Sequence, residues 1–158
     1  MPATQTQTLR FTRRFAASRE RVFRAWTNAQ ELKEWWRPNG FTTGSVEIDL
    51  REGGLYSIAM QPPQGEVRYV HGTYVEVRPP ERLVMTWSTT GSPRHDGNES
   101  LLTIEFVADG DTTEVILTHE HLPEAFVGDH SAGWRSTLDH LSGYLHREPH
   151  AWPLGEPS

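Results

Sequence analysis

The sequence contains no cysteine, a single lysine and no long apolar run. Without cysteine the chain has no disulfide, no thiol nucleophile and no cysteine metal site, and it suits a reducing, cytoplasmic location, which we expect. No stretch of about 18 apolar residues occurs, so we expect no membrane span. The opening residues, MPATQTQTLRF, lack the apolar segment of a signal peptide, and we expect none.

The amino acids that are present indicate one globular domain. The chain has 158 residues, of which 35% are hydrophobic and 23% charged, and this suits a single core. We expect a flexible N-terminus at 1–6, a single domain at 7–147 and a flexible tail at 148–158. The formal net charge of −6 disfavours nucleic acid and anionic membrane surfaces as partners, because both attract clusters of lysine and arginine.

The N-terminal part of the chain predicts one strand followed by two short helices. Apolar residues alternate from Leu9 to Phe15 with the period of a half-buried strand, and Arg13 shares their inward face. Ser18 is suited to the N-cap of a first helix, and Asn28 to that of a second helix that ends before the next proline.

The middle of the chain predicts an antiparallel meander. Short runs of alternating apolar and polar residues are separated by turn signals such as REGG, PPQG and DGD. The residues that we place on inward faces are Val46, Ile48, Leu50, Tyr56, Ile58, Met60, Val67, Tyr69, His71, Thr73, Val75, Val77, Leu83, Met85, Trp87, Leu102, Ile104, Phe106, Val115, Leu117 and His119.

The last third predicts a long amphipathic helix at about 123–147. Its apolar stripe recurs at spacings of four or three residues and consists of Phe126, His130, Trp134, Leu138, Leu141 and Leu145. A strongly twisted sheet can curl around such a helix, and two short helices can fill the space where the sheet fails to close. We expect a cavity inside this arrangement.

Five motifs in this order resemble the START-like (SRPBCC) superfamily, and within it the group of activators of heat-shock protein ATPase homologues (AHSA-type). They are RRFAASRERVFRAWTNAQELKEWWRPNGFT, DLREGG, VHGTYVEVRPPERLVMTW, TEVILTHEHL and HSAGWRSTLDHLSGYL. The resemblance covers about residues 8–146. It implies an α+β helix-grip fold, with a curved antiparallel sheet of about seven strands around a long C-terminal helix and two short helices after strand one. It also implies an internal apolar cavity.

Arg13 and three histidines are the polar candidates for this cavity. Arg13 either anchors a ligand carboxylate or hydroxyl, or forms a structural ion pair at the rim of the sheet. His71, His119 and His130 either orient a polar ligand group and exchange protons, or are core residues satisfied by hydrogen bonds. The HEH run at 119–121 invites a metal, but no third ligand follows at a telling spacing, and we expect neither metal nor cofactor.

The aromatic residues carry most of the information. Eight of them belong to segments that face or cap the groove: Trp26, Trp35, Trp36, Tyr56, Tyr69, Trp87, Phe126 and Trp134. Core packing explains any one of them, but together they favour an apolar pocket. Because adjacent helical residues diverge by about 100°, we expect one of Trp35 and Trp36 to face the core and the other the cavity mouth or solvent.

These observations predict a protein that binds a small hydrophobic or amphipathic ligand between the sheet and the C-terminal helix. The candidate cavity residues are Arg13, Trp35, Trp36, Tyr56, Met60, Tyr69, His71, Met85, Trp87, His119, Phe126, His130 and Trp134. Two alternatives stay open: an aromatase/cyclase-type enzyme that acts on a polyketide-like substrate, and a co-chaperone-like interaction module. We expect binding rather than catalysis. Because the sheet leaves an unclosed edge, we also expect a weak homodimer, formed through sheet or helix surfaces rather than through the cavity.

Overall fold

The structure is a computed structural model that describes residues 6–36, 41–90, 99–123, 127–151, 153–154 and 156–157. Its strands are β1 (Thr6–Phe15), β2 (Thr42–Ile48), β3 (Leu55–Gln61), β4 (Arg68–Arg78), β5 (Arg82–Thr90), β6 (Ser100–Asp109) and β7 (Thr112–Pro123). Its helices are α1 (Arg19–Thr27), α2 (Ala29–Trp35) and α3 (Val127–Ala151). A separate pair of two-residue strands follows, β8 (Pro153–Leu154) and β9 (Glu156–Pro157).

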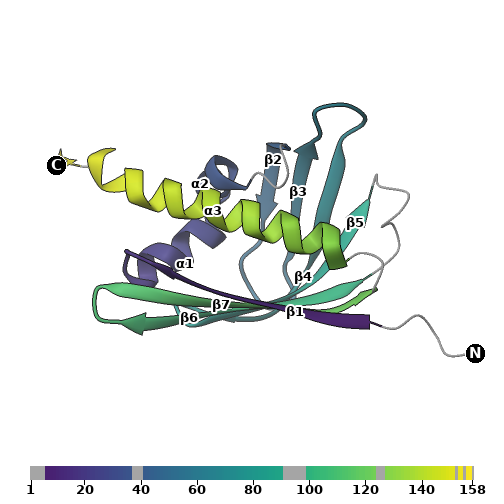
Figure 1. Cartoon of the computed structure of the whole chain (residues 1–158), viewed down its shortest axis with the longest axis horizontal. Helices are drawn as coiled ribbons and strands as arrows, with labels where there is room; N and C mark the ends of the chain where they lie inside the picture. The colour runs from purple at the N-terminus through teal and green to yellow at the C-terminus, as the bar shows by residue number, and fades with distance from the viewer. Residues whose placement is uncertain are drawn as a thin grey trace, which may run out of the picture.

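The seven long strands form one antiparallel sheet in the order β1-β7-β6-β5-β4-β3-β2. Figure 1 shows α3 lying across this curved sheet, with α1 and α2 beside its C-terminal half. This is the helix-grip arrangement that the sequence predicted, and β1 and β2 form the two edges of the sheet. No helix in the described part of the chain combines the length and apolar character needed to cross a membrane.

The inner face of α3 confirms the predicted stripe over its described side chains. Trp134, Leu138, Leu141 and Leu145 are each at most 5% exposed. Their spacing of four, three and four residues keeps them on one side of the helix, so that side packs against the concave face of the sheet. Phe126 and the side chain of His130, which were expected to continue the stripe, lie outside what the structure describes.

Asn28 joins the two short helices. Its backbone N–H donates to Arg24 O at 2.9 Å, which ends α1. Its side-chain Oδ1 accepts from Glu31 N at 3.1 Å, which begins α2. Asparagine suits this junction because its short amide can satisfy an otherwise unpaired N–H in the first turn of a helix. The corner between the helices is therefore tight, as the sequence predicted.

A buried carboxylate ties the two short helices to α3. Glu31 on α2 is 8% exposed, and its oxygens lie 2.6 Å from Arg21 Nη1 and 2.6 Å from Arg24 Nε on α1. The hydroxyl of Tyr144 on α3 donates to Glu31 Oε1 at 2.9 Å. Charge is costly to bury unless it is paired, and these contacts supply the pairing while fixing the position of α2.

The prediction that Tyr69, His71 and Val75 of β4 point inward is wrong. Tyr69 and Val75 are 43% and 53% exposed, whereas Val70 and Tyr74 are buried. The opposite face of β4 therefore packs on the core, and a register shift follows at 74–76.

The physical reason lies in strand pairing. Tyr56 of β3 points inward and lies directly opposite Gly72 of β4, and directly opposed residues share a face of the sheet. Gly72 must therefore face inward, and His71 must face outward. β4 carries apolar residues on both faces, so alternation in its sequence alone could not decide between them.

Candidate functional site

Five described tryptophans gather between the sheet and the helices: Trp26, Trp35, Trp36, Trp87 and Trp134. Each is at most 7% exposed. The centroids of neighbouring rings lie 4.7 to 6.5 Å apart, which is the range of favourable edge-to-face and tilted contacts. The cluster draws one ring from α1, two from the end of α2, one from β5 and one from α3.

Trp35 and Trp36 are both buried, at 0% and 3% exposed, so neither faces solvent, and of the two only Trp36 lines the cavity described below. Trp36 follows the last helical residue and has φ −78° and ψ 90°, so the helical rotation of 100° per residue does not apply to it. Its carbonyl accepts a hydrogen bond from the Thr43 hydroxyl, which holds this turn against β2.

Three of the five indole N–H groups donate to a protein acceptor. They are Trp35 Nε1 to Ala25 O at 3.1 Å, Trp36 Nε1 to Met60 Sδ at 3.2 Å, and Trp134 Nε1 to His119 Nδ1 at 3.0 Å. The Nε1 atoms of Trp26 and Trp87 are buried and have no acceptor among the described residues. Indole N–H is a donor only, so these two groups remain unpaired within the part of the chain that the structure describes.

A cavity of about 20 Å³ lies beside these two rings; we call it the tryptophan cavity. Its described lining residues are Trp26, Leu32, Trp36, Ile48, Tyr56, Ile58, Tyr74, Met85, Trp87 and Leu102. They come from α1, α2 and strands β2 to β6, and none of them carries a charge.

The tryptophan cavity lies under α1 and α2. No described side chain of α3 lines it, and the inner stripe of α3 packs against the sheet. The cavity that the sequence predicts between the sheet and the C-terminal helix stays a prediction.

Two tyrosines, Tyr56 and Tyr74, form part of the cavity wall. The rings of Tyr56 and Tyr74 lie 5.4 Å apart. Burial raises the pKa of Tyr56 well above its ordinary value, and the neighbouring Tyr74 raises it further. Burial also raises the pKa of Tyr74. Both phenols are therefore neutral at physiological pH, which keeps the cavity free of charge.

Gly72 lets Tyr56 reach across β4. The Tyr56 hydroxyl donates to Thr86 O on β5 at 2.5 Å, and Thr73 N donates to Thr86 Oγ1 at 2.9 Å. A Cβ at Gly72 would lie 2.1 Å from Thr86 O, so only glycine permits this approach. Side-chain hydrogen bonds thus replace part of the β4–β5 ladder at this bend.

Of the thirteen predicted cavity residues, four line the cavity: Trp36, Tyr56, Met85 and Trp87. Trp35, Met60 and Trp134 are buried beside it but do not line it. The prediction missed Tyr74, because β4 was assigned the wrong inward face. It also left out aliphatic lining residues such as Leu32, whose apolar character in the sequence is the same as that of any core residue.

His119 belongs to a separate buried hydrogen-bonded chain. It is 0% exposed; its Nδ1 accepts from the Trp134 indole, and its Nε2 lies 2.7 Å from Ser100 Oγ. Because Nδ1 accepts, Nε2 carries the proton and donates to Ser100, whose hydroxyl donates to Trp87 O at 3.2 Å. His119 does not line the tryptophan cavity. His119 is therefore a core residue satisfied by hydrogen bonds, which is one of the two roles that the sequence left open for it.

Arg13 forms an ion pair at the edge of the interior. Its Nη1 lies 2.9 Å from Asp139 Oδ1 on α3, and the two side chains are 32% and 72% exposed. This is the structural ion pair that the sequence analysis gave as one alternative for Arg13. Its partner lies on α3, and the alternation of residues along the strands could not identify it.

His71 lies on the outer face of the sheet, where it lines a cleft of about 350 Å³ with Glu47 and Glu99. Ser57 and Ser88 lie opposite it on β3 and β5.

No cluster of three or more His, Asp or Glu side chains in the described ranges could hold a metal ion. In the HEH run, His121 has φ 66° and is exposed, so it leaves the alternation that would place it beside His119.

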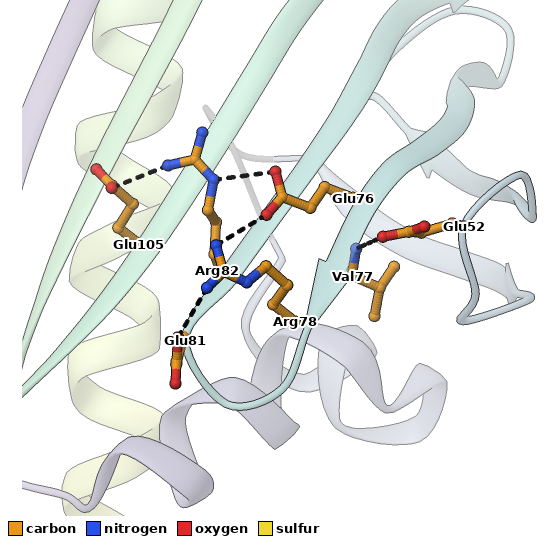
Figure 2. Close-up of polar contacts among 7 residues, drawn as sticks. All are labelled: Glu52, Glu76, Val77, Arg78, Glu81, Arg82 and Glu105. Atoms are coloured by element: carbon orange, nitrogen blue, oxygen red, sulfur yellow. Dashed lines mark hydrogen bonds and ion pairs between the residues drawn. The ribbon is translucent and has the colours of Figure 1, made fainter.

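A second group of polar residues lies at the β4–β5 turn (Figure 2). This β4–β5 network consists of Glu76, Arg78, Glu81, Arg82 and Glu105. Its ion pairs are Arg78–Glu76 at 3.2 Å, Arg78–Glu81 at 3.5 Å, Arg82–Glu76 at 3.2 Å and Arg82–Glu105 at 2.9 Å. Desolvation raises the pKa of Glu76, but hydrogen bonds from Arg78 and Arg82 outweigh it and leave the pKa below its ordinary value.

Residues 16–146 match the family described as "Activator of Hsp90 ATPase homolog 1-like protein". The chain belongs to this family. No curated protein matches the chain in sequence. The match covers α1 to most of α3, and so includes every described residue that lines the tryptophan cavity.

Solved structures of other proteins share the fold of this family member. Protein CV1439 from Chromobacterium violaceum is 26% identical with a TM-score of 0.79, covering 87% of this chain and 96% of its own. The AHSA1 (SPO3351) protein from Silicibacter pomeroyi is 27% identical with a TM-score of 0.79, covering 90% and 99%. CalU16 from Micromonospora echinospora, 22% identical with a TM-score of 0.67 over 92% and 80%, shows the fold alone.

Proposed function

We propose that this protein binds a small apolar molecule in the tryptophan cavity. The observation that carries the proposal is the cavity itself, a space with ten described lining residues, none of them charged. Binding sites for small molecules are mostly lined by hydrophobic and aromatic side chains with a few polar groups among them. The tryptophan cavity has this composition.

The lining must move to admit a ligand. The cavity measures about 20 Å³, which is roughly the space of one water molecule, whereas ligand sites commonly hold about 300 to 1,000 Å³. Met85 has an unbranched, flexible side chain that repacks at low cost. Trp36 lies beyond the last turn of α2. We assign the opening of the cavity to these two side chains.

The positions of the polar residues support binding over cyclase-type catalysis. Arg13 is paired with Asp139, and His119 is held between Trp134 and Ser100. Neither Arg13 nor His119 lines the cavity. A general acid or base must reach the reacting atoms directly or through one water, and these two candidates do not border the space that a substrate would occupy.

Titration of the protein with naphthalene, a sterol and a long-chain fatty acid tests the proposal. Tryptophan fluorescence and melting temperature are the readouts. We expect saturable quenching by at least one ligand with one site per chain, and an increase in melting temperature. A ligand at one hundred times its Kd stabilises the folded state by about 2.7 kcal/mol. Absence of any saturable change across the panel would refute the proposal.

A matched pair of variants locates the site. Met85 lines the cavity, whereas Leu83, on the same strand and also buried, does not. Both Met85→Phe and Leu83→Phe add bulk to the core, at a cost of about 1–3 kcal/mol. We expect only Met85→Phe to weaken binding, because only this change fills the cavity. Equal binding by the two folded variants would place the ligand elsewhere.

A further inference from the structure

Two buried hydrogen-bond donors distinguish the tryptophan cavity from ordinary core. Trp26 and Trp87 are 5% and 7% exposed, and both line the cavity. Their Nε1 atoms have no acceptor among the described residues. Buried polar side-chain atoms are nearly always hydrogen-bonded, and each exception calls for an explanation.

The other three described tryptophans provide an internal comparison. Trp35 and Trp134 do not line the cavity, and each donates to a protein acceptor. Trp36 lines the cavity, and its N–H is bound to Met60 Sδ. The unpaired N–H groups thus occur on rings that line the cavity, although five indoles share one cluster.

The remaining lining groups restrict what can meet these donors. None of the described lining residues is positively charged, so a buried carboxylate or phosphate would lack a counter-charge, and that is costly. The Tyr56 hydroxyl is already donated to Thr86 O. The two rings with unpaired N–H groups therefore belong to an uncharged apolar wall.

We infer that the ligand of the tryptophan cavity is an uncharged apolar molecule with a carbonyl oxygen, which accepts hydrogen bonds from the indole N–H groups of Trp26 and Trp87. This inference rests on the proposed function and narrows its ligand class. It separates ketones, aldehydes and esters from hydrocarbons on one side and from fatty-acid anions on the other.

A pair of ligands with the same shape tests the inference. Acetophenone and α-methylstyrene differ only in a carbonyl oxygen that replaces a methylene group. Apolar burial alone favours the hydrocarbon, because its transfer out of water is more favourable. Hydrogen bonds from the indoles favour the ketone, and we expect it to bind at least about fivefold more tightly. Benzoate, which carries a charge, should not bind.

Nuclear magnetic resonance of the indole N–H groups gives a readout that needs no variant for its interpretation. Both ligands carry the same aromatic ring, so shifts caused by the ring are shared. We expect the N–H resonances of Trp26 and Trp87 to move downfield with acetophenone and not with α-methylstyrene. The N–H resonance of Trp35, which is bound to Ala25 O, should respond equally to both.

Two variants test whether the indole N–H of Trp87 causes the preference for acetophenone. Trp87→Phe keeps an aromatic ring and removes the N–H, so the preference for acetophenone should fall by at least about twofold. Trp35→Phe removes an N–H that does not line the cavity, and the preference should stay unchanged. If Trp87→Phe does not fold, the resonance shifts of the unaltered protein decide the question.

The outcomes separate the two proposals. Tighter binding of acetophenone together with the selective N–H shifts supports the inference. If α-methylstyrene binds as tightly or more tightly, the inference fails and the proposed function stands. If benzoate binds best, the exclusion of anions is wrong. If no ligand in either panel binds, both the proposed function and the inference fail.

Discussion

The tryptophan cavity and the β4–β5 network differ in whether their polar groups are paired. In the network, Arg78 and Arg82 are each paired with two carboxylates. The hollow beside it measures about 310 Å³, far more than the 20 Å³ of the cavity. Two tryptophans that line the cavity, Trp26 and Trp87, have indole N–H groups with no acceptor among the described residues.

The difference shows why volume alone does not identify a binding site. Partly exposed ion pairs that satisfy one another contribute little stability and leave little capacity for a ligand. An unpaired donor in an apolar interior is costly until an acceptor arrives. The four predictions below test this contrast, from the largest expected effect to the smallest.

The largest effect is expected from Trp134→Ala, which removes a ring from the centre of the tryptophan cluster. We expect a loss of roughly 3–5 kcal/mol in the free energy of unfolding, measured with urea. The change also deprives His119 Nδ1 of its donor. Arg135→Ala, an exposed neighbour on α3, is the control and should cost little. A loss below about 1 kcal/mol for Trp134→Ala would contradict the observed packing.

The second prediction compares a buried carboxylate with a partly exposed one. Glu31→Gln removes the carboxylate that pairs with Arg21, whose side chain is 15% exposed, and with Arg24, and we expect a loss of about 3 kcal/mol. Glu105→Gln removes an ion pair of the network whose side chains are 34% and 39% exposed, and should cost less than about 1 kcal/mol. Urea titration measures the free energy of unfolding of the two variants. Similar losses would show that the buried and the partly exposed carboxylate contribute equally to stability, contrary to the prediction.

The third prediction concerns alkaline pH. Unfolded tyrosines ionise near pH 10, whereas Tyr56 and Tyr74 have raised pKa values in the folded protein. Above about pH 10 the folded state therefore binds more protons than the unfolded state, and stability falls as pH rises. Each tyrosine contributes a slope of about 1.4 kcal/mol per pH unit. Tyr74→Phe should reduce the slope by one proton; an unchanged slope would show that Tyr74 ionises normally.

The smallest effect is expected from Glu76 in the network. Its pKa is lowered, so the stability it contributes is present above the ordinary carboxyl pKa and is lost as pH falls through the lowered value. At neutral pH, Glu76→Gln should leave the urea midpoint nearly unchanged. A carboxyl titration followed by nuclear magnetic resonance should give a pKa below the usual glutamate value, and added salt should raise it. A pKa that does not depend on salt would contradict this view of an exposed network.

Periodicity in the sequence predicted the elements and their order, because each element repeats its buried positions within a few residues. The stripe from Trp134 to Leu145 is such a case. The prediction of the inward face of β4 was wrong. Tyr69 and Val70 are both apolar, and only pairing with β3 decides which of them is buried. The sequence did predict that Trp35 and Trp36 differ, and only Trp36 lines the cavity. It did not predict the burial of both rings, because the backbone of Trp36 leaves the helix.

The partners of polar residues were beyond the reach of the sequence. Arg13 and Asp139 are 126 residues apart, and their ion pair depends on which turn of α3 faces β1. His119 and Ser100 meet between neighbouring strands whose register no single segment determines. The unpaired indoles could not be predicted either, because the lack of an acceptor depends on every neighbour at once.

One consequence follows from Asn28, which ends α1 with its backbone N–H and begins α2 with its side chain. Disruption at this residue removes a hydrogen bond from both helices at once, so the two helices form a single cooperative unit. Trp26 lies on one side of Asn28, and Trp36 lies on the other. Amide exchange at the end of α1 and at the start of α2 should therefore report one shared opening rate. A bound molecule that leaves by separation of these two helices, rather than past the side chains of Met85 and Trp36, can leave no faster than this rate.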